Sequence, residues 1–293
     1  MFFLALLVVF LGIVISLIAY GKQGMFYLYH PPRSLPRDTF EEKTLFDMAV
    51  AKLKYAFGFV KPTKIITHFQ RIKKDDEVLA YFSSYNDSKT TLVYFHGNGN
   101  NFNDNQDELR IIQEQLEVNI LAVEYPGYGE RKGYPSKSRI LEGIKQLWTV
   151  LPEQIRKKRL YFFGHSIGAA IALESLKLFE GVEGIILYNP FESFKKMMEK
   201  VMSKHRYLKY LTFTKHLSSE TWNNDEIVKK LKVPCLILAG TLDGLIPLKQ
   251  KRNLWMICKS DCDIEEFNQG HSGNFTDEVW KKFKSFLNKR KSI

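Results

Sequence analysis

The chain has 293 residues and a formal net charge of +11, and 45% of its residues are hydrophobic. This hydrophobic content excludes an intrinsically disordered chain and is sufficient for the core of one catalytic domain of ordinary size. The sequence contains no zinc-ligand spacing, no RNA-binding signature and no long basic tail, so we expect no nucleic-acid partner. The excess positive charge fits either an ordinary basic surface or contact with an anionic membrane.

The cysteines are few and odd in number. They are Cys235, Cys258 and Cys262, and Cys235 falls in a predicted buried strand. This pattern gives no indication of a disulfide framework and fits a reducing compartment.

Residues 2–20 form an uncharged apolar run. As a helix this run would span about 28 Å, close to the ~30 Å hydrocarbon core of a membrane. A cleaved signal peptide usually has a basic start and a shorter apolar run, although Ala19 and Gly21 leave cleavage as an alternative. Basic residues follow the run and none precedes it, which predicts a single-pass anchor with the rest of the chain in the cytosol.

Residues 21–60 are predicted to be a tether and N-terminal extension, and residues 61–290 an α/β domain. Strands and helices alternate along this domain, which predicts a mostly parallel central sheet with helices on both faces. Asn103 is expected to cap the helix after the third strand, with Gln106 three residues later. Strands are expected at residues 65–69 and 78–83 (an antiparallel opening pair), 91–95, 119–125, 160–163, 184–188, 235–239 and 262–267. Helices are expected near residues 140–151, 167–179, 249–257 and 277–287.

The loop after the third predicted strand contains His96, Gly97 and Asn98. A His-Gly loop at this place is typical of lipases and esterases, where a backbone N–H stabilises an oxyanion. We expect the Asn98 N–H to be one such donor, and His96 to shape the loop.

Residues 164–168 have the sequence Gly-His-Ser-Ile-Gly, between a predicted buried strand and a predicted helix. This is the pattern of the nucleophile elbow, in which a sharp turn projects the serine hydroxyl clear of the sheet. Ser166 is therefore the expected nucleophile, and the Ile167 N–H the second oxyanion donor. His165 is expected to be a neighbour that shapes the loop.

A serine nucleophile needs a histidine base and an acid that orients the histidine. In proteins with a nucleophile elbow these three residues follow along the chain in the order Ser, Asp or Glu, His. His271 follows a predicted strand and is the expected base, whereas His205 and His216 lie in a lysine-rich helical segment. Asp243 lies in a glycine-flanked loop after the preceding strand and is the expected acid, with Glu192 as the alternative.

Residues 191–232 form an insertion between two predicted strands, with an apolar, methionine-containing stripe and many lysines. One interpretation is an amphipathic helix packed on the domain. The other is a short helical cap over the site, whose methionines adapt to an acyl chain and whose lysines face anionic lipid.

These motifs together resemble the membrane-anchored abhydrolase-domain serine hydrolases, relatives of monoacylglycerol lipase and of the serine-aminopeptidase-like domain. The matching segments are 94–100, 124–129, 133–136, 164–168, 233–243 and 270–271, and the resemblance covers about residues 65–290. Glu124-Tyr125-Pro126 differs from the family's usual Asp-Tyr-Arg, and Gly99 and Asn100 vary the usual loop. A cysteine cluster for palmitoylation, present in one protein-depalmitoylating branch, is absent from the N-terminal sequence.

The resemblance implies an α/β-hydrolase fold behind an N-terminal transmembrane helix. We expect a serine hydrolase that cleaves an ester or thioester with a lipid-like acyl group through an acyl-enzyme on Ser166, without a metal or organic cofactor. The alternatives are an amidase or peptidase with the same triad, and a non-catalytic binding protein on this fold. The sequence does not determine the oligomeric state.

Overall fold

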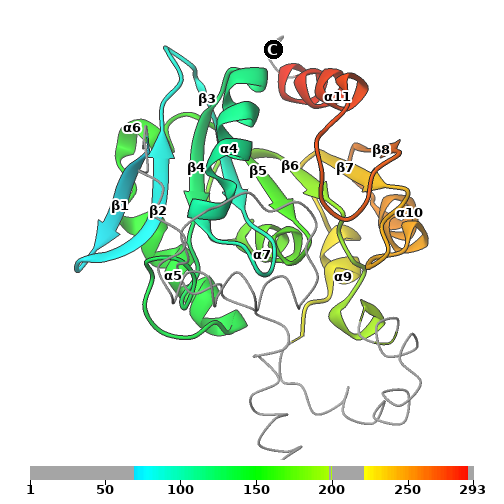
Figure 1. Cartoon of the computed structure of the whole chain (residues 1–293), viewed down its shortest axis with the longest axis horizontal. Coiled ribbons are helices and arrows are strands. Elements are labelled where there is room, and N and C mark those ends of the chain that lie inside the picture. Colours follow the sequence, from blue (N-terminus) through cyan, green and yellow to red (C-terminus); the bar gives the residue numbers. More distant parts are fainter. Residues whose placement is uncertain (1–68, 198, 200–220, 290–293) are drawn as a thin grey trace, which may run out of the picture.

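The structure, a computed structural model, describes residues 69–197, 199 and 221–289 (Figure 1). The predicted anchor at 2–20, the tether at 21–60 and most of the predicted cap lie outside these residues. Among the helices of the described residues, none has the length and apolarity that a membrane crossing requires.

An eight-stranded sheet organises the described chain, in the order β1-β2-β4-β3-β5-β6-β7-β8. The pairs β1–β2 and β2–β4 are antiparallel and all the other pairs are parallel. The strands are β1 (Gln70–Lys74), β2 (Glu77–Ser83), β3 (Thr90–Phe95), β4 (Asn119–Val123), β5 (Arg159–His165), β6 (Val182–Tyr188), β7 (Cys235–Gly240) and β8 (Cys262–Phe267). The mostly parallel sheet expected from the sequence is therefore confirmed.

Helices cover both faces of the sheet, and each face has its own apolar cluster. One face packs against α5 (Lys137–Val150), α6 (Glu153–Arg156), α7 (Ile167–Ser175), α9 (Asn224–Val228) and α10 (Leu248–Ile257). The other packs against α4 (Phe102–Leu116) and α11 (Asp277–Asn288). Because the central strands are buried on both faces, they have continuous apolar runs, as in the segment from Leu160 to Phe163.

Three local expectations need correction. The first described strand begins at Gln70 and residues 70–74 pair with β2, so the opening pair extends beyond the expected range 65–69, of which residues 65–68 lie outside the described residues. The helix after Ser166 ends at Ser175 rather than residue 179. Asn101, not Asn103, caps α4: its side chain accepts from the Asp104 N–H, and the Asp104 carboxylate accepts from the Asn101 N–H. This reciprocal capping box satisfies two otherwise free N–H groups, which is why the helix starts two residues earlier.

Candidate active site

Ser166 lies on a sharp turn between β5 and α7, with φ 56° and ψ −116°. The two glycines of the motif make this turn possible. A Cβ on Gly168 would lie 2.0 Å from the Phe95 carbonyl oxygen, and a Cβ on Gly164 would lie 2.4 Å from the Gly168 carbonyl oxygen. Only glycine permits such close packing, so these residues bring the start of α7 against the end of β3. The serine is thereby held in a backbone conformation that is costly for a residue with a side chain.

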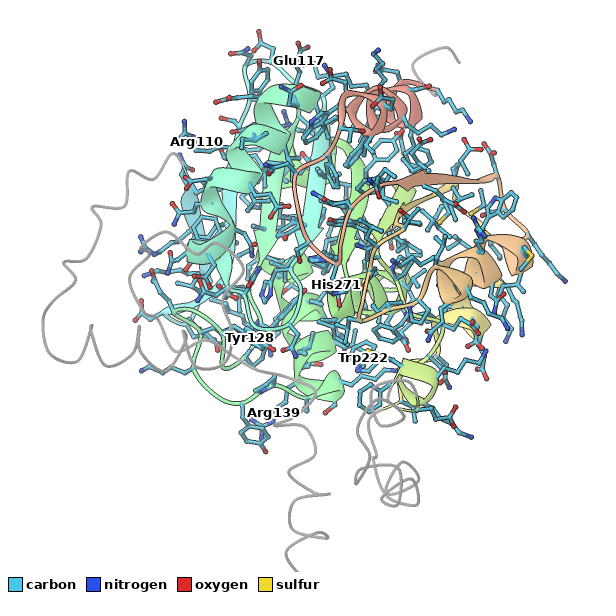
Figure 2. All side chains as sticks on the ribbon, turned by 45° about the vertical axis from the view of Figure 1, so that its right-hand side comes forward. Arg110, Glu117, Tyr128, Arg139, Trp222 and His271 are labelled. Carbon is cyan, nitrogen blue, oxygen red and sulfur yellow. The ribbon has the colours of Figure 1, made fainter. Side chains whose placement is uncertain are left out.

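His271 connects the serine to the predicted acid. It lies in the loop between β8 and α11, which runs toward the carboxyl ends of the central strands (Figure 2). Its Nε2 is 3.0 Å from Ser166 Oγ, and its Nδ1 is 2.8 Å from Asp243 Oδ2. The structure therefore brings together the three residues that the sequence predicts as nucleophile, base and acid. Because a carboxylate only accepts, this contact places a proton on Nδ1 and leaves the neutral ring's Nε2 as an acceptor toward the serine.

The Asp243 side chain is fully buried and each of its oxygens is hydrogen-bonded. Oδ1 accepts from the backbone N–H groups of Leu245 and Ile246, both at 2.9 Å. Oδ2 accepts from Lys251 Nζ at 2.8 Å in addition to His271. Burial alone would raise the pKa of Asp243, but the hydrogen bonds from His271, Lys251 and Ile246 together hold this pKa well below its usual value. The acid is therefore a carboxylate at neutral pH.

Two side chains hold the backbone of the His271 loop. Asn189, directly after β6, donates its Nδ2 to the His271 carbonyl oxygen at 2.8 Å, and its Oδ1 accepts from the Gly240 N–H at 2.8 Å. His165 Nε2 lies 2.9 Å from the same His271 carbonyl oxygen. Burial, and then the neighbouring His271, lower the pKa of His165 to about 3, so this ring is neutral and carries its proton on Nε2. The loops after β6, β7 and β8 are thus joined by direct hydrogen bonds.

The two predicted oxyanion donors lie on neighbouring segments. Ile167 opens α7, and Asn98 lies in the loop after β3, where its Oδ1 accepts from the Tyr128 hydroxyl at 3.0 Å. The contact of Gly168 with the Phe95 and His96 carbonyl oxygens brings these segments together. His96 Nε2 lies 3.0 Å from a carboxylate oxygen of the buried Glu124.

Glu124 links the oxyanion loop to α4. Its other carboxylate oxygen accepts from the Phe102 N–H at 3.0 Å. The glutamate that departs from the family's usual aspartate therefore contacts both ends of the loop 96–102.

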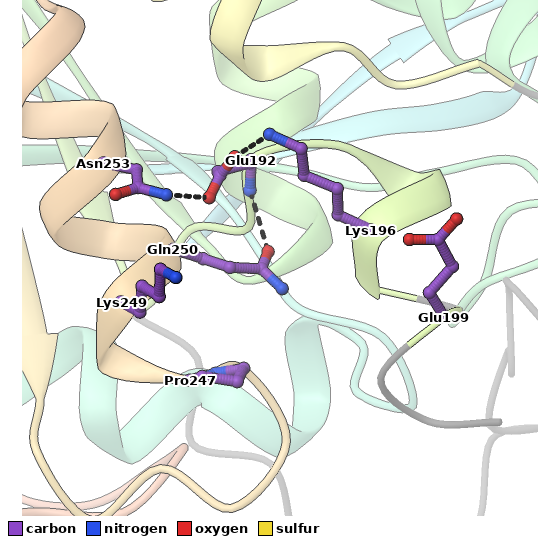
Figure 3. A pocket seen from close by; sticks show the side chains of 7 residues that line it. All are labelled: Glu192, Lys196, Glu199, Pro247, Lys249, Gln250 and Asn253. Atoms are coloured by element: carbon purple, nitrogen blue, oxygen red, sulfur yellow. Dashed lines mark hydrogen bonds and ion pairs between the residues drawn. The ribbon is translucent and has the colours of Figure 1, made fainter. Parts of the chain in front are cut away.

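Glu192, the alternative acid, points elsewhere. Its carboxylate accepts from Asn253 Nδ2 at 2.7 Å and from Lys196 Nζ, and its backbone N–H donates to Gln250 Oε1 (Figure 3). These residues line an open cavity of about 530 Å³ together with Glu199, Pro247 and Lys249. Neither Ser166 nor His271 lines this cavity, and it is Asp243 that contacts His271.

Two residues near the triad were not expected from the sequence, namely Lys251 and Asn189. A weak signal existed for Lys251, because it occupies the buried stripe of α10 between Leu248 and Leu254, where an apolar residue is expected. Asn189 follows a buried strand directly and has φ 46°, but an asparagine at a strand end is more often a simple turn residue.

Part of the chain is similar in sequence to known proteins. Residues 86–227 match the family of the serine aminopeptidase, S33. The protein Bem46 of Schizosaccharomyces pombe is 30% identical over 189 residues, covering 63% of this chain and 62% of Bem46. The lysophosphatidylserine lipase ABHD12 of Danio rerio is 25% identical over 186 residues, covering 60% of this chain and 49% of that protein. The aligned region thus spans less than two thirds of either relative.

Solved structures show the same fold at low sequence identity. The esterase Pf2001 of Pyrococcus furiosus superposes with a TM-score of 0.59 at 18% identity, covering 87% of this chain and 99% of that one. The sheet order, the elbow at Ser166 and these matches show that the chain has the α/β-hydrolase fold, and its sequence is similar to the serine aminopeptidase S33 family and to the Bem46 and ABHD-type proteins.

Proposed function

We propose that this α/β-hydrolase cleaves an acyl ester or thioester through an acyl-enzyme on Ser166. The observation that carries the proposal is the continuous contact from Ser166 Oγ to His271 Nε2 and from His271 Nδ1 to Asp243 Oδ2, at 3.0 and 2.8 Å. Such a contact lets one imidazole remove the serine proton while its tautomer is fixed by the acid.

In the proposed first half-reaction, His271 takes the Ser166 proton as Oγ attacks the substrate carbonyl carbon. The backbone N–H groups of Asn98 and Ile167 then stabilise the negative oxygen of the tetrahedral intermediate. The intermediate expels the alcohol or thiol, which leaves with the proton from His271, and the acyl group stays on Oγ. In the second half-reaction His271 takes a proton from water as the water oxygen attacks the acyl carbon. The acyl–Oγ bond of the resulting tetrahedral intermediate then breaks, Ser166 Oγ takes the proton from His271, and the carboxylic acid is released.

A lipid-like acyl group is the substrate that we propose. Leu242 and Leu245 lie on either side of Asp243 and are 65% and 41% exposed, so the loop that contains Asp243 has an apolar outer surface. The apolar run at 2–20 would place the domain beside a membrane as a single-pass anchor, and the related ABHD12 is a lipase by name. These observations favour an acyl chain over a polar acyl group.

An amidase or peptidase reaction is the second candidate, because the matching family is that of a serine aminopeptidase. The triad geometry does not select the leaving group, since the same acyl-enzyme forms from an ester, a thioester or an amide. Purified protein should be assayed side by side with acyl esters, acyl thioesters and aminoacyl amides of matched acyl group. We expect the ester or thioester to be cleaved; faster cleavage of the amide would favour the second candidate.

Substitution of the triad tests the mechanism directly. Ser166→Ala should abolish labelling by a fluorophosphonate probe and all ester hydrolysis, with an unchanged thermal unfolding curve. Asp243→Asn should lower kcat by about 10⁴-fold, because the wrong imidazole tautomer is then favoured, whereas Glu192→Gln should leave kcat within a few-fold. Wild-type labelling of the Ser166→Ala protein would refute the nucleophile, and a wild-type protein that the probe does not label would indicate a binding protein.

A further inference from the structure

Lys251 is a lysine in the interior of the domain, on the first turn of α10. It has 0% exposure, and its Nζ donates to Asp243 Oδ2 at 2.8 Å and to the Gly240 carbonyl oxygen at 2.9 Å. Burial lowers the pKa of Lys251, and the hydrogen bond and charge of Asp243 oppose that shift. The site thus contains a buried ion pair between the predicted acid of the triad and a residue outside it.

Stability alone does not account for a lysine at this position. Taking an ammonium group out of water is costly, and replacing a buried ion pair by apolar side chains of similar volume is often neutral or stabilising. The start of a helix is also the end at which a positive charge is least favourable. An apolar residue here would complete the buried stripe of α10 between Leu248 and Leu254. The contact of Lys251 with Asp243 is therefore a better explanation of this charge than stability is.

The lysine binds the same carboxylate oxygen as the imidazole. Asp243 Oδ2 accepts from both Lys251 Nζ and His271 Nδ1, whereas Oδ1 is held by two backbone N–H groups. The Lys251 ammonium thus fixes the carboxylate in the orientation that His271 needs. It also offsets part of the negative charge that would otherwise attract a second proton to the ring.

The other titratable groups around the acid do not duplicate this effect. His165 of β5 is neutral, because burial lowers its pKa to about 3. The hydroxyl of Tyr188 of β6 is also neutral, because burial raises its pKa. After the His271 ring, the strongest side-chain influence that lowers the pKa of Asp243 is the hydrogen bond from Lys251.

We propose that Lys251 is a positioning residue of the hydrolytic site, which orients the Asp243 carboxylate and keeps the His271 ring in its neutral, proton-accepting form to lower pH. This inference rests on the proposed function of the triad. Lys251 is fully buried, so it acts through Asp243 and not by contact with the substrate.

The test is the pH profile of the full chain in detergent, measured as kcat and KM for an acyl ester and as the rate of fluorophosphonate labelling. In Lys251→Met the acidic limb of the profile should move to higher pH by about one unit, since Asp243 then attracts the imidazolium without an opposing charge. The plateau kcat should fall several-fold while KM stays unchanged. Lys251→Arg, which keeps the positive charge, should restore the acidic limb toward that of the wild type.

Lys249→Met is the matched control, because it removes one lysine charge from the exposed side of the same helix. It should leave the profile unchanged. Lys251→Gln serves as the second variant if Lys251→Met does not fold, because the shorter amide removes the charge and retains a donor group. An acidic limb at the wild-type pH in the folded Met or Gln variant, or an equal movement in Lys249→Met, would overturn the inference.

A separate readout distinguishes failure of this inference from failure of the proposed function. If wild-type protein neither hydrolyses esters nor reacts with the probe, the proposed function fails. The low-field NMR resonance of the His271 Nδ1 proton still reports on the ring in that case. Its pH titration should move upward in Lys251→Met relative to the wild type, and coincident titrations would refute the role of Lys251 independently of turnover.

Discussion

At the scale of single residues, the His271 loop depends on side chains that are themselves outside the proposed chemistry. His165 lies within hydrogen-bond distance of the His271 carbonyl oxygen, and its ring stacks on Tyr188 with the centroids 4.5 Å apart. Asn189 donates to the same carbonyl oxygen. Ser166 directly follows β5, which is paired with strands on both sides. His271 lies in a loop after the edge strand β8, so these hydrogen bonds, and not strand pairing, hold its position. They hold His271 in place before substrate arrives.

The buried His165 predicts how stability depends on pH. Its pKa is about 3 in the folded protein and about 6.5 in the unfolded chain. Between these values the unfolded state binds a proton that the folded state does not, so the free energy of unfolding falls as the pH falls through this window. The contribution of this residue to the slope is at most about 1.4 kcal/mol per pH unit.

Urea unfolding at pH 5 and pH 7 measures this contribution. His165→Gln should be less stable than the wild type at pH 7, because it loses the ring stacking and weakens the contact with the His271 carbonyl. It should, however, lose less stability between pH 7 and pH 5. Equal losses for the two proteins over that interval would show that His165 does not remain neutral in the folded state.

At the scale of elements, the turn between β5 and α7 depends on the absence of side chains at two positions. Gly164 and Gly168 each lie against backbone atoms that a Cβ would overlap. The backbone of β3, and not a flexible side chain, is the neighbour of Gly168, so an added methyl group can be accommodated only if α7 moves. A movement of α7 displaces Ser166 and Ile167 together.

Gly168→Ala should therefore destabilise the protein by about 1–3 kcal/mol through overpacking, and it should lower kcat strongly in the fraction that remains folded. Gly244→Ala is the matched control, because a Cβ at Gly244 meets nothing within 4 Å. Thermal unfolding and ester hydrolysis of both variants provide the comparison. A Gly168→Ala protein with wild-type activity would show that the close approach of α7 to β3 is not needed for the site.

At the scale of the whole molecule, the described domain and the predicted anchor make different demands on the environment. The domain buries two apolar clusters, one on each face of the sheet, and none of its described helices is long and apolar enough to cross a membrane. The run at 2–20 has no charge and would satisfy its backbone within a membrane as a helix. The basic residues that follow it predict that the domain faces the cytosol.

Glycosylation measures this orientation, because the chain contains two acceptor sequences with exposed asparagines, Asn86 and Asn274. We expect both to stay unmodified in eukaryotic cells, and the domain in sealed membranes to be digested by added protease. The control is the same domain behind a cleavable secretory signal, which should acquire glycans. Glycans on the unaltered chain would reverse the predicted orientation.

The sequence alone determined the parts of this protein that depend on local rules. Alternating strands and helices predicted the mostly parallel sheet, because each element buries its apolar residues with its own period. The elbow was evident because its two glycines and its serine lie within five residues. The order Ser166, Asp243, His271 followed from the loops after successive strands, which meet at one edge of such a sheet.

Only the tertiary structure decided which side chains meet. Ser166 and His271 are 105 positions apart, and it is the Asp243 carboxylate, which the sequence already favoured, and not that of Glu192, that contacts the His271 ring. Lys251 was missed because a lysine in an amphipathic helix ordinarily points to solvent, and its place on the apolar stripe of α10 was only a weak signal that did not indicate Asp243 as its partner. A hydrogen bond between distant residues depends on positions that the whole fold sets to within an ångström, and local sequence patterns do not contain those positions.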